Sequence, residues 1–164
     1  MEERRGPPVL WTGGSLEEVR ENLGADTVRA LSKAERVAKY GEVFTPLHIV
    51  QKMCDALPLE AWEPQKTFLE PTCGEGVFVV EVLRRKFENC RTRSDYTTAL
   101  RSVYAMDILP DNVEKTIRNV EALCDGFFRP TKAELQIIND HVIQADSLKV
   151  MRMINQLNEW EGKR

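Results

Sequence analysis

Apolar residues in the second half of the chain follow two different spacings. Over residues 76–88, and again from Pro110 to Cys124, they recur every three or four positions, which indicates amphipathic helices. Short apolar runs typical of buried strands lie before, between and after these helices, at 67–70, 102–107 and 141–146. Strands that alternate with helices favour parallel pairing with right-handed crossovers, so the pattern predicts an α/β fold. We expect three further segments: a polar loop over 89–97, a short helix over 131–138 and a helix in the last 18 residues.

Another helix is predicted ahead of the sheet. Thr45 is a good N-cap residue, and Pro46 suits the first helical position. The apolar residues that follow at helical spacing predict one buried face, made of Leu47, Val50, Met53, Cys54 and Leu57. Pro58 is predicted to end this helix, because proline does not continue a helical interior.

The first forty residues are rich in charge, proline and glycine. Ser15 and Glu18 fit a capping box, and helical composition then runs to about Lys39. We therefore interpret residues 1–40 as an N-terminal arm with helices and residues 41–164 as the main domain.

Composition and charge narrow the class of protein. The 164 residues carry a formal net charge of -3, which argues against this chain being the main electrostatic clamp on DNA. No apolar run approaches the ~18 residues of a membrane helix, and no signal peptide is evident, so we expect a soluble, cytoplasmic protein. The four cysteines and two histidines lack the spacing of a metal site, so we expect reduced, mostly buried thiols and no metal.

All three predicted strands end in a carboxylate: Glu70, Asp107 and Asp146. The carboxyl ends of parallel strands line one edge of a sheet, where doubly wound folds bind their ligands. Gly74 and Gly76 follow Glu70 in a tight turn, and glycine allows the backbone to approach a ligand closely. A strand-end acid taken alone is often only the N-cap of the next helix, so a functional interpretation depends on the combination.

Four segments carry recognisable motifs: residues 41–46, 68–78, 104–108 and 144–148. Together they resemble the motifs of N6-adenine DNA methyltransferases of restriction–modification systems, which use S-adenosylmethionine. The likeness covers roughly residues 36–150 and is most specific in Phe44-Thr45-Pro46 and in the run from Glu70 to Gly76. It implies a Rossmann-like methyltransferase fold, with a truncated parallel sheet flanked by helices and an N-terminal helical segment.

The resemblance also implies roles for individual residues. Glu70 would hold the cofactor ammonium, Asp107 the ribose hydroxyls and Asp146 the adenine amino group. Ile108 would pack on the adenine ring, and the backbone from Thr72 to Gly76 would surround the methionine tail. The complete implied S-adenosylmethionine site comprises Phe44, Thr45, Pro46, Glu70, Pro71, Thr72, Cys73, Gly74, Gly76, Asp107, Ile108, Asp146, Ser147 and Leu148.

The chain departs from the family pattern at the catalytic motif. The family's Asn/Asp/Ser-Pro-Pro-Tyr/Phe signature follows a fourth strand, but neither is evident after Asp146, and the one Pro-Pro pair is Pro7-Pro8. No catalytic residue is therefore assigned. Without a fourth strand, the first strand keeps an open edge, which favours self-association or a partner polypeptide that completes the sheet. DNA is the expected ultimate substrate, bound weakly by this chain alone.

Three interpretations of the function stay open. The chain is the cofactor-binding half of a DNA adenine methyltransferase, a non-catalytic S-adenosylmethionine-binding module or remnant, or a methyltransferase that acts on RNA or protein. All three imply cofactor binding, and the sequence separates them poorly.

Overall fold

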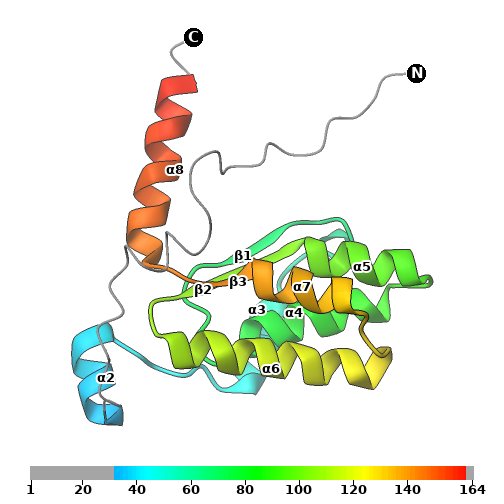
Figure 1. The fold of residues 1–164 in the computed structure, drawn as a ribbon, viewed down its shortest axis with the longest axis horizontal. Coiled ribbons are helices and arrows are strands. Elements are labelled where there is room, and N and C mark those ends of the chain that lie inside the picture. The colour runs from blue at the N-terminus through cyan, green and yellow to red at the C-terminus, as the bar shows by residue number, and fades with distance from the viewer. Residues whose placement is uncertain (1–31, 162–164) are drawn as a thin grey trace. The chain divides into compact units, whose positions relative to one another are not determined.

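The computed structural model describes residues 32–161 of the chain. Contacts within the chain define two compact units, Met1–Glu42 and Val43–Arg164. The second unit contains a three-stranded sheet with its helices (Figure 1). None of the helices within the described range is both long enough and apolar enough to cross a membrane.

The described part of the first unit is α2 (Lys33–Tyr40) and the residues that flank it. The helix begins at a capping box, in which the Ser32 hydroxyl accepts from the Glu35 amide and the Glu35 carboxylate accepts from the Ser32 amide. It ends at Gly41, whose φ of 66° is left-handed. The capping box predicted at Ser15 lies outside the described residues.

The sheet is parallel, and its strand order is β1-β2-β3. Phe68 lies opposite Val103, and Ala105 lies opposite Val142. The prediction of a parallel α/β fold is therefore confirmed, and the strands are β1 (Phe68–Glu70), β2 (Val103–Asp107) and β3 (Val142–Gln144).

The two long crossover helices lie on one face of the sheet (Figure 1). The crossover helices α4 (Val77–Glu88) and α6 (Pro110–Phe127) pack against each other, and α3 (Leu47–Asp55) packs against α4. Val79, Leu83 and Phe87 of α4 are buried in the core that these helices form with the strands. On the opposite face of the sheet, Leu69 and Tyr104 keep about two fifths of their surface exposed, at 42% and 39%.

The segment between β1 and β2 contains a helix that the sequence did not predict. The polar loop expected over 89–97 is wrong from Arg93 onward, where α5 (Arg93–Arg101) begins. The helix starts at a capping box between Thr92 and Asp95. Its composition is too polar to show an apolar stripe, so the cap determines where it begins.

The short helix expected over 131–138 is confirmed, but it runs further, as α7 (Lys132–His141). His141 is consequently the last residue of a helix and not the first of a strand. The third strand is shorter than predicted, because β3 ends at Gln144. The helix expected near the end of the chain is α8 (Ser147–Glu161).

The helix ahead of the sheet differs from its prediction at both ends. Pro46 occupies the N-cap position of α3, and its carbonyl accepts from the amides of Ile49 and Val50 at 2.9 and 3.2 Å. Thr45 therefore does not cap the helix. The helix ends at Asp55, before Pro58, which instead precedes a short 3-10 helix, η1 (Leu59–Trp62).

The predicted buried face of α3 is only partly buried. Val50 and Cys54 are buried, but Leu47, Met53 and Leu57 expose 53%, 55% and 41% of their surface. Periodicity identified an apolar face correctly, and the described residues do not cover all of it.

Candidate functional site

The carboxyl ends of β1 and β2 form the centre of the candidate site. Glu70 and Asp107 are the last residues of these two neighbouring strands, and Glu70 lies opposite Ala105 in the sheet. The loop from Pro71 to Gly76 leaves β1 at this edge and leads into α4. The fold thus brings an acid from each strand and the glycine loop to one place, as the order of the sequence motifs predicted.

Asp107 holds the loop in place. One oxygen of its carboxylate accepts from the Gly74 amide at 2.9 Å, and the other accepts from the Leu109 amide at 2.9 Å and from Asn112 Nδ2 at 3.2 Å. The residue is buried. An ionised carboxylate has roughly four acceptor positions, so these three donors leave about one for a ligand hydroxyl.

Glu70 is less occupied than Asp107. Its Oε1 accepts from the Thr72 amide at 3.2 Å, while Oε2 has no donor among residues 32–161. The side chain is half-buried. Glu70 therefore offers a negative charge with a free acceptor position at the sheet edge, which suits a cationic group such as an ammonium.

The glycine loop is held by backbone hydrogen bonds. The Cys73 amide donates to the Met106 carbonyl at 2.9 Å, and the Gly76 amide donates to the Cys73 carbonyl at 2.8 Å. Gly74 and Gly76 have φ values of 52° and 84°, a left-handed backbone that residues with a Cβ adopt only with strain. Both glycines are therefore required by the turn itself.

Phe44 connects the upstream motif to this loop. A Cβ built at Gly74 would lie 3.5 Å from Cε1 of the Phe44 ring, so the ring rests on the loop at van der Waals distance. Phe44 exposes 39% of its surface, while Thr45 is half-buried and Pro46 is exposed at the start of α3. Two motifs separated by about thirty residues thus meet in space.

Asp146 has a different setting from the other two acids. It lies two residues beyond the end of β3, and its Oδ1 accepts from the amides of Leu148 and Lys149 at the start of α8, at 3.1 and 3.3 Å. The strand-end arrangement predicted for it is therefore wrong, and its first role is that of a helix cap. The Ala145 amide donates to the Asp107 carbonyl at 2.9 Å, which keeps Asp146 near the same edge.

The remaining implied site residues surround this edge. Ile108 exposes 44% of its surface beside Asp107, and its carbonyl accepts from Gln144 Nε2 at 3.2 Å. Ser147 is half-buried, while Leu148 exposes 69% of its surface. Ile108 therefore presents an apolar surface at the edge, and Leu148 points largely into solvent.

Three polar residues of α6 belong to the site and were missed in the sequence. Thr116 Oγ1 donates to the Gly74 carbonyl at 3.0 Å, and Asn119 Nδ2 donates to the Glu75 carbonyl at 2.8 Å. The third is Asn112, which donates to Asp107. Their spacing of four and three residues places them on one side of α6 and is the signal that could have identified them.

The thiol in the loop is not suited to nucleophilic chemistry. Cys73 is buried, and burial, together with the charges of Asp107 and Glu70, raises its pKa to about 11, although a hydrogen bond with Thr116 opposes this. The thiol is therefore neutral near pH 7. The described residues also contain no group of three His, Cys, Asp or Glu side chains placed to hold a metal ion.

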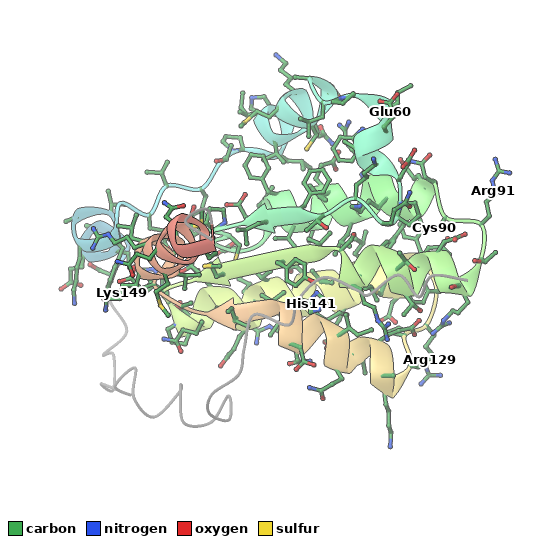
Figure 2. All side chains as sticks on the ribbon, turned by 90° about the horizontal axis from the view of Figure 1, so that it is seen from above. Glu60, Cys90, Arg91, Arg129, His141 and Lys149 are labelled. Atoms are coloured by element: carbon green, nitrogen blue, oxygen red, sulfur yellow. The ribbon has the colours of Figure 1, made fainter. Side chains whose placement is uncertain are left out.

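A mostly apolar cavity of about 200 Å³ lies beside β1, and Glu70 is one of the residues that line it. Residues of α3, β1 and α4 line it, among them Met53, Leu57, Leu69, Phe78 and Val82. In Figure 2, α3 lies beyond β1, on the side opposite β2. The exposed residues of α3 therefore border the edge of β1 that has no partner strand among residues 32–161.

The chain was compared with protein-family models, with curated proteins and with solved structures, and none matched. The geometry alone thus describes what this edge of the sheet is suited to do. It combines an acid with a free oxygen, a loop of backbone amides at a helix N-terminus and an exposed aliphatic side chain. A small ligand with cationic, anionic and apolar parts would find a partner for each.

Proposed function

We propose that this protein binds S-adenosylmethionine and forms the cofactor-binding half of a cytoplasmic DNA adenine-N6 methyltransferase of a restriction–modification system. The observation that carries the proposal is the convergence of three distant sequence motifs. Phe44 lies against Gly74, and the amide of Gly74 donates to Asp107, beside Glu70. In the sequence these residues belong to separate motifs that resemble those of one enzyme family.

The residues at this edge of the sheet fit the parts of this cofactor. The free oxygen of Glu70 suits the ammonium, and the uncapped N-terminus of α4 suits the carboxylate. Asp107 can accept one ribose hydroxyl in addition to its three internal donors, and Ile108 offers an apolar surface to the adenine. Asp146 retains Oδ2 for the adenine amino group, 3.6 Å from Lys149 Nζ. When bound, S-adenosylmethionine supplies a methyl group already activated on a sulfonium.

The proposal includes a second polypeptide that carries the site for the target base. The backbone N–H and C=O of Leu69 point away from β2, because the Phe68 amide donates to Ser102 of the neighbouring segment and successive residues alternate. Leu69 is also partly exposed, as are Met53 and Leu57 beside it. An added strand would satisfy the backbone and cover these side chains. The partner would also supply most of the grip on DNA, since this chain carries a net charge of -3.

Calorimetric titration tests the proposal with S-adenosylmethionine and with S-adenosylhomocysteine, its demethylated product. We expect the wild-type chain to bind both. Glu70→Ala should weaken binding roughly 10- to 100-fold, as loss of a hydrogen bond to a charged group does. Glu60→Ala is the matched control, because Glu60 is exposed on η1 and should leave affinity unchanged.

Two outcomes would change the conclusion. If the folded wild-type chain gives no heat with either compound, the assignment of the cofactor site fails. If it binds both but transfers no labelled methyl group to DNA when co-expressed with the products of neighbouring reading frames, the chain is instead a non-catalytic S-adenosylmethionine-binding module.

A further inference from the structure

Helix α6 contacts the glycine loop through a side chain that lies about forty residues further along the chain. Thr116 is fully buried, and its hydroxyl donates to the Gly74 carbonyl at 3.0 Å. The same Thr116 oxygen lies 3.6 Å from Cys73 Sγ, a contact in which either atom can be the donor. Thr116 Oγ1 thus contacts two neighbouring residues of the loop, Gly74 and Cys73.

The next loop carbonyl is held in the same way. Asn119 Nδ2 donates to the Glu75 carbonyl at 2.8 Å, and Lys115 forms an ion pair with the Glu75 carboxylate. Two successive carbonyls of the loop, from Gly74 and Glu75, are therefore turned toward α6. Two contacts within the loop add to this orientation: the Gly76 amide donates to the Cys73 carbonyl at 2.8 Å, and Cys73 Sγ lies 3.7 Å from the Gly74 carbonyl oxygen.

The orientation of a carbonyl fixes the N–H of the same peptide group. In a trans peptide the C=O and the N–H point in opposite directions, and the described residues contain no cis peptide. The Glu75 N–H therefore points away from Thr116 and α6. It has no acceptor among residues 32–161, whereas the amides of Cys73, Gly74 and Gly76 all have one.

This N–H adjoins further free donors. Helix α4 has Gly76 at its N-cap position and no side chain that caps it. The amides of Val77 and Phe78 in its first turn also have no acceptor among the described residues. An anionic group placed here would meet backbone donors from the loop and from the helix together.

We infer that Thr116 is a positioning residue for ligand binding. Its hydroxyl fixes the Gly74–Glu75 peptide so that the Glu75 N–H and the first turn of α4 face the anionic group of the ligand. The identity of that group as the carboxylate of S-adenosylmethionine rests on the proposed function. The fixing of the peptide does not.

Two substitutions separate the hydroxyl from the rest of the side chain. Thr116→Val keeps the shape but removes the hydroxyl, and Thr116→Ser keeps the hydroxyl but removes the methyl group. The probes are S-adenosylhomocysteine, which carries the carboxylate, and methylthioadenosine, which lacks the amino-acid part. We expect Thr116→Val to weaken binding of S-adenosylhomocysteine roughly tenfold and to leave methylthioadenosine unchanged, while Thr116→Ser stays within about threefold for both.

Several results would overturn the inference. Unchanged affinity of Thr116→Val for S-adenosylhomocysteine would do so. So would an equal loss for both probes, which indicates general damage to the fold, or a loss in Thr116→Ser as large as in Thr116→Val.

An NMR measurement on the protein without ligand keeps this test separate from that of the proposed function. The Glu75 and Gly76 amide signals should move in Thr116→Val and stay near their wild-type positions in Thr116→Ser. If the wild-type chain binds neither probe, the proposed function fails, and these signals still decide whether Thr116 orients the loop.

Discussion

Lys86 shows how far the surroundings of one residue can differ from what its sequence neighbours indicate. It belongs to the basic run Arg84-Arg85-Lys86 near the end of α4, but it is fully buried. Its Nζ donates to the carbonyls of Glu63, Pro64 and Lys66, at 2.8, 3.3 and 2.6 Å. Burial lowers the pKa of Lys86 to about 8, so the amine still carries its proton at pH 7. The residue therefore closes the turn that leads into β1.

Replacing this lysine should cost considerable stability. Lys86→Met removes the donor for three carbonyls but keeps most of the apolar stem, so we expect the free energy of unfolding to fall by about 3 kcal/mol. Urea denaturation followed by circular dichroism measures the change. Lys132→Met is the matched control, because Lys132 is exposed at the start of α7 and should change stability by less than about 0.5 kcal/mol. Equal losses in the two variants would contradict the role given to Lys86.

The sequence located the acids of the site better than it located the residues that support them. Glu70 and Asp107 are the last residues of short apolar strands, and such a position can be recognised from the sequence alone. Thr116 and Asn119 act on carbonyls more than forty residues away, and a polar residue on an amphipathic helix is normally solvated. Only the packing of α6 against the loop distinguishes these residues from ordinary surface positions.

At the scale of elements, α5 and α7 are joined by a buried carboxylate. Glu134 of α7 accepts from Arg93 Nε and from Thr97 Oγ1 of α5, both at 2.9 Å, and from the amide of Thr131 at 2.8 Å. Burial acts to raise the pKa of Glu134, but the hydrogen bonds from Arg93, Thr131 and Thr97 outweigh it and lower the pKa to about 2. The same residue completes the capping box of α7.

This lowered pKa predicts a loss of stability in acid. Since the folded pKa lies below the ordinary value of 4.5, the unfolded chain binds the proton first as the pH falls. The contribution of Glu134 is therefore complete above about pH 4.5 and is lost progressively toward pH 2. Denaturation curves at pH 7, 5 and 3 should show the wild type about 3 kcal/mol more stable than Glu134→Gln at pH 7, with a smaller difference at pH 3.

A gap between the two proteins that does not depend on pH would contradict this account of Glu134. Glu88→Gln serves as the control, because Glu88 is an exposed residue at the end of α4 whose side chain pairs with Arg84. Its curve at pH 7 should lie close to that of the wild type, because an exposed ion pair contributes little to stability.

Regular spacing explains which elements were predicted. The strands and the helices α4 and α6 have long apolar patterns, and their existence follows from periodicity. In α5 the apolar residues cluster near the end, at Ala99 and Leu100, so no stripe marks its start. Its capping box uses Asp95 in place of the usual Glu or Gln, which weakens the local signal.

At the scale of the whole molecule, the apolar surface exceeds what the described residues bury. The cavity of about 200 Å³ and the open edge of β1 adjoin the exposed part of α3. Periodicity predicts that a face is apolar but does not identify the segment that covers it. For this reason the amphipathic pattern of α3 predicted burial at Met53 and Leu57 that the structure does not show.

The open edge should make the isolated chain associate. Unpaired strand edges favour pairing with other chains, so we expect the weight-average mass from light scattering to rise with concentration. Leu69→Lys places a charge at this edge and should suppress the rise. Leu59→Lys is the control, because Leu59 is 85% exposed and does not line the cavity. A wild-type mass that stays monomeric up to millimolar concentration, or equal effects of the two substitutions, would count against pairing at β1.

The contact between the loop and α6 also limits how this protein can evolve. A methyl group at Gly76 would lie 2.7 Å from Thr116 Cγ2, and the φ of 84° penalises any side chain there even if Thr116 became smaller. Any substitution of Gly76 is therefore disfavoured for two separate reasons, the contact with Thr116 and the left-handed backbone. Gly126 in α6 should by contrast accept alanine, since a Cβ there meets nothing within 4 Å and alanine favours a helix. The two glycines thus differ in whether the fold tolerates a side chain in their place.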